Sequence, residues 1–116
     1  MNIYSITLKF ENEIQTLKAI ALSKNQSTTV VRNYEIDLEQ TYFISVVHNE
    51  LNSSLDLTGI TPFQLIFFDS NQNFVGASFS TGEPNHLFTI QTTAKHILLI
   101  PLKDKVNLSG LELIEI

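Results

Sequence analysis

The side chains that could ligate a metal are few and scattered along this sequence of 116 residues. The three histidines, His48, His86 and His96, form no His-x-x-x-His pair, and their separations match no local metal motif. Glu83 and His86 lie three residues apart and could supply half of a metal site, but a solvated turn explains both without a metal. We therefore expect no metal site and no cofactor.

One segment imitates the start of a calcium-binding loop. In Asp69-Ser70-Asn71-Gln72-Asn73, oxygen-bearing side chains occupy alternate positions, as they do in such loops. Phe74 then stands where the loop needs a glycine for its sharp turn, and Ser80 stands where it needs a bidentate acid. The pattern instead predicts a hairpin turn held by hydrogen bonds from Asp and Asn side chains to the backbone.

Signals of covalent catalysis are weak. The chain has no Cys, and Ser78 does not lie in the Gly-x-Ser-x-Gly turn of a nucleophile elbow. Four glycines form no phosphate-cradling loop, and the absence of Trp removes the best stacking surface for a sugar. We expect a protein that is not an enzyme. The alternative is a small β-barrel protein with a ligand or substrate pocket that involves Asp56, Asp69, His48 or His96.

The charge balance excludes several partners. Seven basic residues stand against twelve acidic ones, giving a net charge of −5, and the basic residues do not cluster. Binding to a nucleic acid backbone by electrostatic attraction is therefore not expected. No apolar run exceeds four residues, so we expect no membrane insertion. Polar and charged residues interrupt any apolar signal-peptide core near the N-terminus, so we expect synthesis in the cytoplasm without a signal peptide.

The elements that must position these side chains are mostly strands. Ile, Val and Thr make up 30 of the 116 residues, and β-branched side chains favour strands. Alternating or short apolar runs bounded by turn signals predict strands at 4–10, 34–39, 41–48, 63–68, 74–79, 87–91, 97–102 and 111–116. We therefore expect an all-β fold: one domain over residues 1–116, an antiparallel sandwich or flattened barrel of eight to ten short strands. Residues 23–28 and 49–59 are predicted to be loops, and Ile14–Leu22 fits either a short helix or a returning strand.

Two predicted strands, at 65–68 and 97–100, are apolar on both faces. One face of an antiparallel sheet usually meets water, so these strands need a second cover, from the chain's own loops, a helix at 14–22 or another protein. The low content of charged residues also leaves few Lys or Glu side chains to protect sheet edges. We therefore expect a non-enzymatic structural or interaction subunit that assembles with itself or with a larger complex, such as a phage or contractile particle. The residues expected in its interface are Leu65, Phe67, Phe68, Ile97 and Leu99.

Several segments of the C-terminal half share a family pattern. Residues 58–69 contain a Thr-Pro step followed by an apolar run that ends in Asp, and residues 73–75 continue it after a turn with Val. Residues 94–101 form an alanine-led apolar strand, and residues 110–116 form a closing strand. In these segments the chain resembles the domain-of-unknown-function family numbered one hundred and ninety-two, whose members are small β-rich bacterial and archaeal proteins.

The chain departs from that family pattern at several points. Gln64 and Leu99 stand where the family has acidic residues, and its Gly-Leu-Met and Trp-Met segments are missing here. The resemblance implies a compact β fold and no assigned activity.

Overall fold

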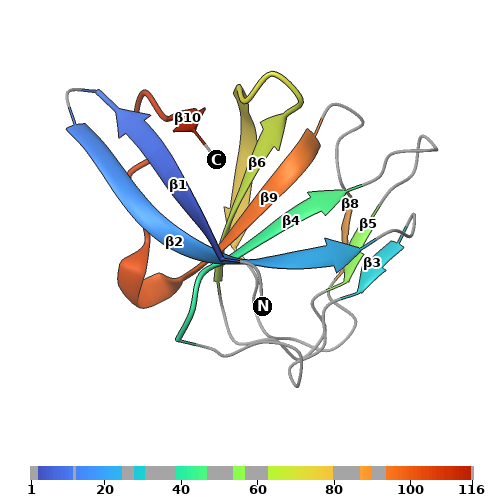
Figure 1. Cartoon of the computed structure of the whole chain (residues 1–116). Coiled ribbons are helices and arrows are strands. Elements are labelled where there is room, and N and C mark those ends of the chain that lie inside the picture. The colour runs from blue at the N-terminus through green and yellow to red at the C-terminus, as the bar shows by residue number, and fades with distance from the viewer. Residues whose placement is uncertain are drawn as a thin grey trace.

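The structure is a computed structural model that describes residues 3–11, 13–24, 28–30, 39–46, 54–56, 63–79, 87–89 and 94–115. Ten strands and a short 3-10 turn run through these residues (Figure 1), so the all-β prediction is confirmed. The elements are β1 (Ile3–Phe10), β2 (Glu13–Lys24), β3 (Thr28–Val30), β4 (Tyr42–Val46), β5 (Ser54–Asp56), β6 (Phe63–Asp69), β7 (Phe74–Phe79), β8 (Leu87–Thr89), β9 (Ala94–Pro101), η2 (Leu102–Asp104) and β10 (Glu112–Glu115).

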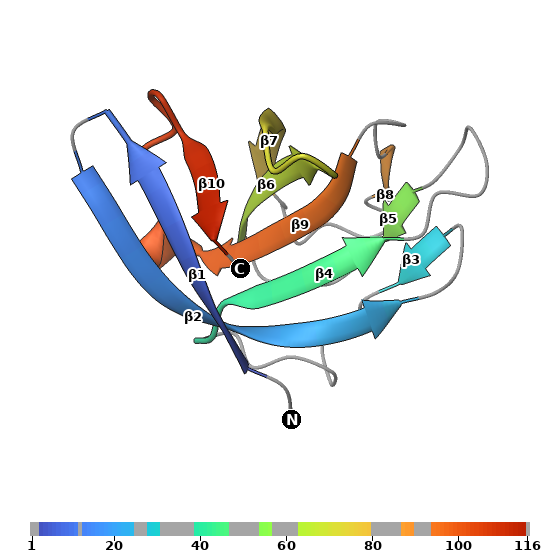
Figure 2. The same cartoon turned by 45° about the horizontal axis from the view of Figure 1, so that its top comes forward.

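Seven strands form one sheet in the order β10-β1-β2-β4-β9-β6-β7, and the other three form a second sheet in the order β3-β5-β8. The three-stranded sheet lies beside the ends of β2 and β4 (Figures 1 and 2). The prediction of an antiparallel arrangement is wrong at two places, because β2 pairs with β4 in parallel and β3 pairs with β5 in parallel. Alternation of apolar residues identifies a strand but not its neighbour, so the sequence gives no sign of these parallel pairs.

The seven-stranded sheet curls so strongly that strands far apart in its order share one core. Ile6 and Leu8 of β1 pack in the same buried cluster as Ile66 and Phe68 of β6, although three strands separate β1 from β6 in the sheet. Within the described residues the two edge strands, β10 and β7, do not pair with each other. The sheet is therefore curled like a barrel but not closed (Figure 2).

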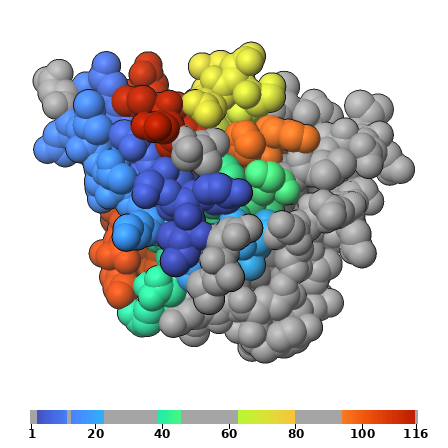
Figure 3. Space-filling model, viewed as in Figure 1, coloured from blue at the N-terminus to red at the C-terminus, as the bar shows by residue number. Residues whose placement is uncertain are grey.

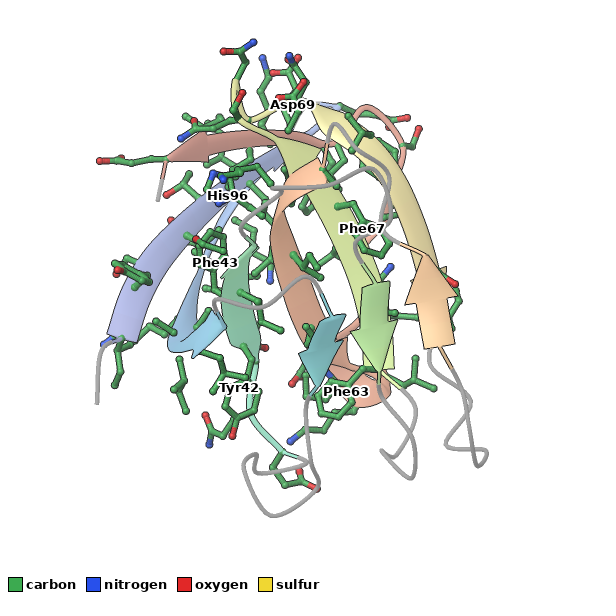
Figure 4. The ribbon with its side chains drawn as sticks, turned by 90° about the vertical axis from the view of Figure 1, so that its right-hand side faces the viewer. Tyr42, Phe43, Phe63, Phe67, Asp69 and His96 are labelled. Carbon is green, nitrogen blue, oxygen red and sulfur yellow. The ribbon has the colours of Figure 1, made fainter. Side chains whose placement is uncertain are left out.

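Each face of the central strands has its own buried cluster. The inner cluster, on the concave side, consists of Ile6, Leu8, Ala19, Phe43, Ile66, Phe68, Leu98, Ile100, Val106, Leu111 and Leu113. The outer cluster, on the other side, consists of Tyr42, Ile44, Phe63, Leu65, Ala94, Ile97 and Leu99. Figure 4, viewed from the side of the three-stranded sheet, labels Tyr42 and Phe63 of the outer cluster. Because both clusters are buried in a single chain, the chain itself covers both faces.

β2 passes from one cluster to the other along its length. Leu17 and Ala19 pack in or against the inner cluster, whereas Ile20 and Leu22 pack against the outer one. The positions that pack against a cluster change from odd to even between residues 19 and 20, which produces an apolar spacing that also suits a helix. This change of phase explains why segment 14–22 fits two interpretations, and the structure assigns it to a strand.

The other predicted strands differ from the observed ones mainly in their bounds. Strands occur where the sequence predicts them in 4–10, 41–48, 63–68, 74–79, 87–91, 97–102 and 111–116. The loop predictions are wrong where β3 begins at Thr28 and where β5 occupies Ser54–Asp56. The strand predicted at 34–39 falls outside the described residues except for Glu39, which lies in a turn.

The segment after β9 closes one end of the curled sheet through a buried glutamine. The Gln64 side-chain amide donates to the Val106 carbonyl (3.0 Å), and the Val106 N–H donates to Gln64 Oε1 (2.8 Å). Near β10, Gly110 has a φ of +66°, and a Cβ there would lie 3.1 Å from the backbone nitrogen of Glu11. Glycine is therefore the residue that fits this turn, which brings the chain back to pair β10 with β1.

Candidate functional site

Four of the five residues predicted to form an interface lie in the cores of the chain. Leu65, Phe68, Ile97 and Leu99 have no exposed area, and Phe67 is partly buried against the outer cluster. A side chain without exposed area cannot contact a second chain while the fold is intact. Leu65, Phe68, Ile97 and Leu99 therefore stabilise the fold, and an interface on the folded chain needs residues with exposed area.

His96 lies among aromatic and polar side chains at one end of the inner face. Its ring stacks on Phe43 with 5.2 Å between centroids and an interplanar angle of 24°. Figure 4 labels both residues, which lie on the paired strands β4 and β9. His96 Nδ1 lies 3.3 Å from Ser45 Oγ, and Tyr4 packs edge-on against Phe43 with centroids 5.9 Å apart. The arrangement places a hydroxyl group against an imidazole on an apolar support.

Asp69 serves the turn between β6 and β7. Its Oδ1 accepts the N–H groups of Asn71 (2.9 Å) and Asn73 (2.8 Å), and its Oδ2 accepts the Asn73 side-chain amide (3.2 Å). These hydrogen bonds, led by the one from the Asn73 backbone, hold the pKa of the Asp69 carboxyl below its ordinary value. The predicted side-chain-to-backbone turn is confirmed. In a catalytic triad the acid accepts a hydrogen bond from the imidazole and orients it, whereas the Asp69 carboxylate accepts these hydrogen bonds from Asn71 and Asn73 of its own turn.

The structure brings together two of the four residues predicted to line a pocket. Asp69 and His96 are close enough for their charges to interact, at the same end of the paired strands β6 and β9. Asp56 lies on β5 in the three-stranded sheet, and His48 lies outside the described residues. In the part of the chain that the structure describes, no three His, Cys, Asp or Glu side chains gather to hold a metal ion.

The position of His96 predicts a loss of stability in mild acid. Burial, reinforced by the charge of Lys95 and opposed by that of Asp69, holds the His96 pKa below its ordinary value of 6.5. On acidification, His96 therefore binds a proton near pH 6.5 in the unfolded chain but only at a lower pH in the folded chain. The free energy of unfolding consequently falls as the pH drops below 6.5. The fall ends below the folded-state pKa.

Urea unfolding of the wild type and His96→Phe between about pH 7.5 and 5.5 checks this expectation. Phenylalanine keeps the stacking on Phe43 and removes the titration, so the variant is expected to lose less stability on acidification. Parallel pH profiles for the two proteins would contradict the expectation.

The edge strand β7 exposes two phenylalanines at one edge of the seven-stranded sheet. In the described part of the chain it pairs with β6 alone, which leaves its other side without a strand neighbour. Phe74 and Phe79 are 36% and 47% exposed. Register places Phe74, Ala77 and Phe79 opposite Phe68, Ile66 and Gln64, so all three face the inner side. We call Phe74–Phe79 the β7 edge.

The other edge strand, β10, is protected where the β7 edge is not. Two of the four residues of β10 are glutamates, Glu112 and Glu115, and charged side chains on an edge discourage pairing with another chain. The β7 edge contains no charged residue and no proline among its six residues. A bulge at Phe67/Phe68 disturbs the register only next to the turn, so Gly76–Phe79 form a regular edge. The β7 edge is therefore the candidate interface.

Sequence reasoning identified the strand at 74–79 but not its place at the edge of the sheet. The available signal was its composition, Phe-Val-Gly-Ala-Ser-Phe, which has no charge although the segment lies next to a polar turn. That composition marks an unprotected strand only once its neighbours are known.

Comparisons with known proteins add no relative to this picture. No protein family matches the chain, and no curated protein or solved structure matches it. The resemblance of the C-terminal half to the domain-of-unknown-function family numbered one hundred and ninety-two stays a prediction. The described residues include no helix that is both long and apolar enough to cross a membrane.

Proposed function

We propose that this chain is a non-enzymatic assembly subunit that associates with copies of itself through the β7 edge. The observation that carries the proposal is an edge strand with two exposed phenylalanines and no charge, whose outer side has no strand neighbour among the described residues. Such an edge can accept a further strand, because main-chain hydrogen bonds supply affinity and the flanking side chains supply specificity. A structural component of a phage or contractile particle is one setting for such a subunit.

The sequence of the β7 edge suits pairing with a second copy. Antiparallel pairing about a two-fold axis sets one residue opposite its own copy, and Ala77 lies near the middle of the regular part of the edge. Gly76, Ala77 and Ser78 are small and allow two strands to approach closely. Phe79 of each copy then lies toward the Phe74 end of the other, so aromatic side chains are buried at both ends.

Charge favours the same location. A net charge of −5 makes two copies repel each other, and this repulsion is weakest where neither surface carries charge and salt screens the rest. The β7 edge meets this condition, whereas pairing through β10 would bring Glu112 and Glu115 of two chains together.

Sedimentation velocity over a concentration series tests the proposal with the variant Ala77→Lys. The wild type is expected to show a monomer–dimer equilibrium, and Ala77→Lys is expected to weaken it by at least about tenfold, because two lysines would face each other across the two-fold axis. Ser70→Lys adds the same charge in the exposed turn beside β7 and is expected to associate like the wild type. Ile114→Lys does the same on β10, where Ile114 is 44% exposed.

A wild type that stays monomeric at every concentration would contradict the proposal. So would an Ala77→Lys variant that associates as tightly as Ser70→Lys. Loss of association in Ile114→Lys alone would move the interface to β10 and would also refute the choice of β7.

A further inference from the structure

A second feature of the surface is a hollow between β2, the segment before β4 and the segment that follows β9. It has a volume of about 420 Å³. Its described lining consists of Gln15, Leu17, Lys18, Glu39, Gln40, Thr41, Ile100, Lys103, Asp104 and Lys105. Figure 3 shows η2 and residues before β4 as neighbouring patches at the lower left, below β2. The volume falls within the range of small-molecule sites in proteins, about 300–1,000 Å³.

The hollow concentrates positive charge in an acidic chain. Among the described residues, three of the seven basic residues of the chain line it, together with two acidic ones, which gives the described lining a net charge of +1. The remainder of the chain carries four basic and ten acidic residues. A lysine cluster on such a background indicates a local attraction for anions that the net charge conceals.

One of the two acidic residues that line the hollow already forms an ion pair. Glu39 Oε2 lies 2.6 Å from Lys103 Nζ, and this ion pair joins the segment before β4 to η2. Within the described residues Lys18 and Lys105 form no ion pair. In the described part of the hollow, two ammonium groups therefore remain for a bound anion, against the carboxylate of Asp104.

The walls of the hollow are fixed by the fold rather than by loops alone. Ile100 of β9 is buried and Leu17 of β2 is half-buried, so the apolar part of the lining belongs to the inner cluster. The Ile20 N–H donates to the Thr41 carbonyl (2.9 Å), which ties the segment before β4 to β2. A preformed site loses little free energy to ordering when a ligand binds.

We propose that this hollow binds a small molecule that carries at least two negative charges on oxygen atoms. Lys18 and Lys105 supply the ammonium groups. Gln15, Gln40 and Thr41 supply neutral hydrogen-bond donors around them. The required chemistry is shared by phosphoryl groups and by polycarboxylates. This binding does not depend on assembly through the β7 edge.

Calorimetric titration at low ionic strength with pyrophosphate, and separately with citrate, tests the proposal and distinguishes the two sources of charge. At least one probe is expected to bind saturably at one site per chain. The double variant Lys18→Gln/Lys105→Gln is expected to lose about tenfold or more in affinity. The control Lys9→Gln/Lys95→Gln removes the same charge from residues outside the lining and is expected to stay within about twofold of the wild type.

Chemical shift changes should centre on the backbone amides of Lys18, Thr41 and Lys105. The proposal is overturned if neither probe saturates, or if both double variants lose affinity equally, since the latter would mean attraction by net charge alone. Binding that leaves those three amides unchanged would place the anion elsewhere and would also overturn it.

Discussion

Replacing Phe68 by Asp is expected to unfold the chain. Phe68 is fully buried in the inner cluster, where it packs with residues from strands on both sides of the curled sheet. Removing a buried phenylalanine costs about 3–5 kcal/mol, and an unpaired buried carboxylate adds a desolvation cost to that loss. The sum reaches the lower end of the stability of an ordinary domain, about 5–15 kcal/mol. Leu99→Asp is expected to act in the same way from the outer cluster.

Far-ultraviolet circular dichroism and urea unfolding check this outcome, with Phe79→Asp as the matched control. Phe79 is also a phenylalanine on an inner-facing position, but it lies on the exposed β7 edge. The control is expected to keep the fold and to lose self-association. If Phe68→Asp unfolds cooperatively at a urea concentration close to that of the wild type, then Phe68 is not buried in the inner cluster.

The second large effect is expected from Gln64→Ala. Gln64 is 2% exposed, and its side chain pairs with both backbone groups of the buried Val106. The substitution removes two hydrogen bonds and leaves a buried N–H and a buried carbonyl without their partner. We expect a loss of roughly 2–4 kcal/mol in the free energy of unfolding, together with faster hydrogen exchange at the Val106 amide.

Asn107→Ala is the control from the same segment. Asn107 is exposed, and its side chain accepts one hydrogen bond, from the Ser109 N–H at 3.0 Å. Its removal is expected to cost well under half as much as the loss of Gln64, because exposed groups regain water as a partner. Equal effects of the two substitutions would show that Gln64 does not anchor this segment.

Much of the secondary structure could be predicted because the pattern of apolar residues within a strand reflects which of its faces are buried. β6 and β9 are apolar on both faces, and each face meets its own buried cluster. The turn at Asp69 was readable because an Asp followed by two Asn residues has a local hydrogen-bonding preference. These signals act within a few residues, so the sequence displays them directly.

The pairing of the strands could not be predicted in the same way. The parallel neighbours β2 and β4 are joined in the sheet by backbone hydrogen bonds, which carry no signature of residue type. β2 also changes phase between the two clusters, which hides its alternation. The strand β5 (Ser54–Asp56) has only three residues, which is too short for an alternation of apolar and polar side chains to be recognised.

The candidate interface lies beyond prediction for a related reason. Exposure of the β7 edge depends on β7 being last in the sheet, and that order follows from long-range pairing. Residues that the sequence suggests for an interface, such as Phe68 and Leu99, are instead buried in the two clusters of the curled sheet. Apolar strands with two covered faces are therefore equally consistent with a curled single chain and with an assembly.

Amide hydrogen exchange of β7 as a function of protein concentration measures the edge pairing most directly. If two chains add their β7 strands to each other, the outward amides of Gly76–Phe79 become more protected as concentration rises, while those of β10 do not change. Ala77→Lys should abolish the dependence. Exchange in β7 that is the same at every concentration, in a sample whose central strands stay protected, would mean that no chain adds to this edge.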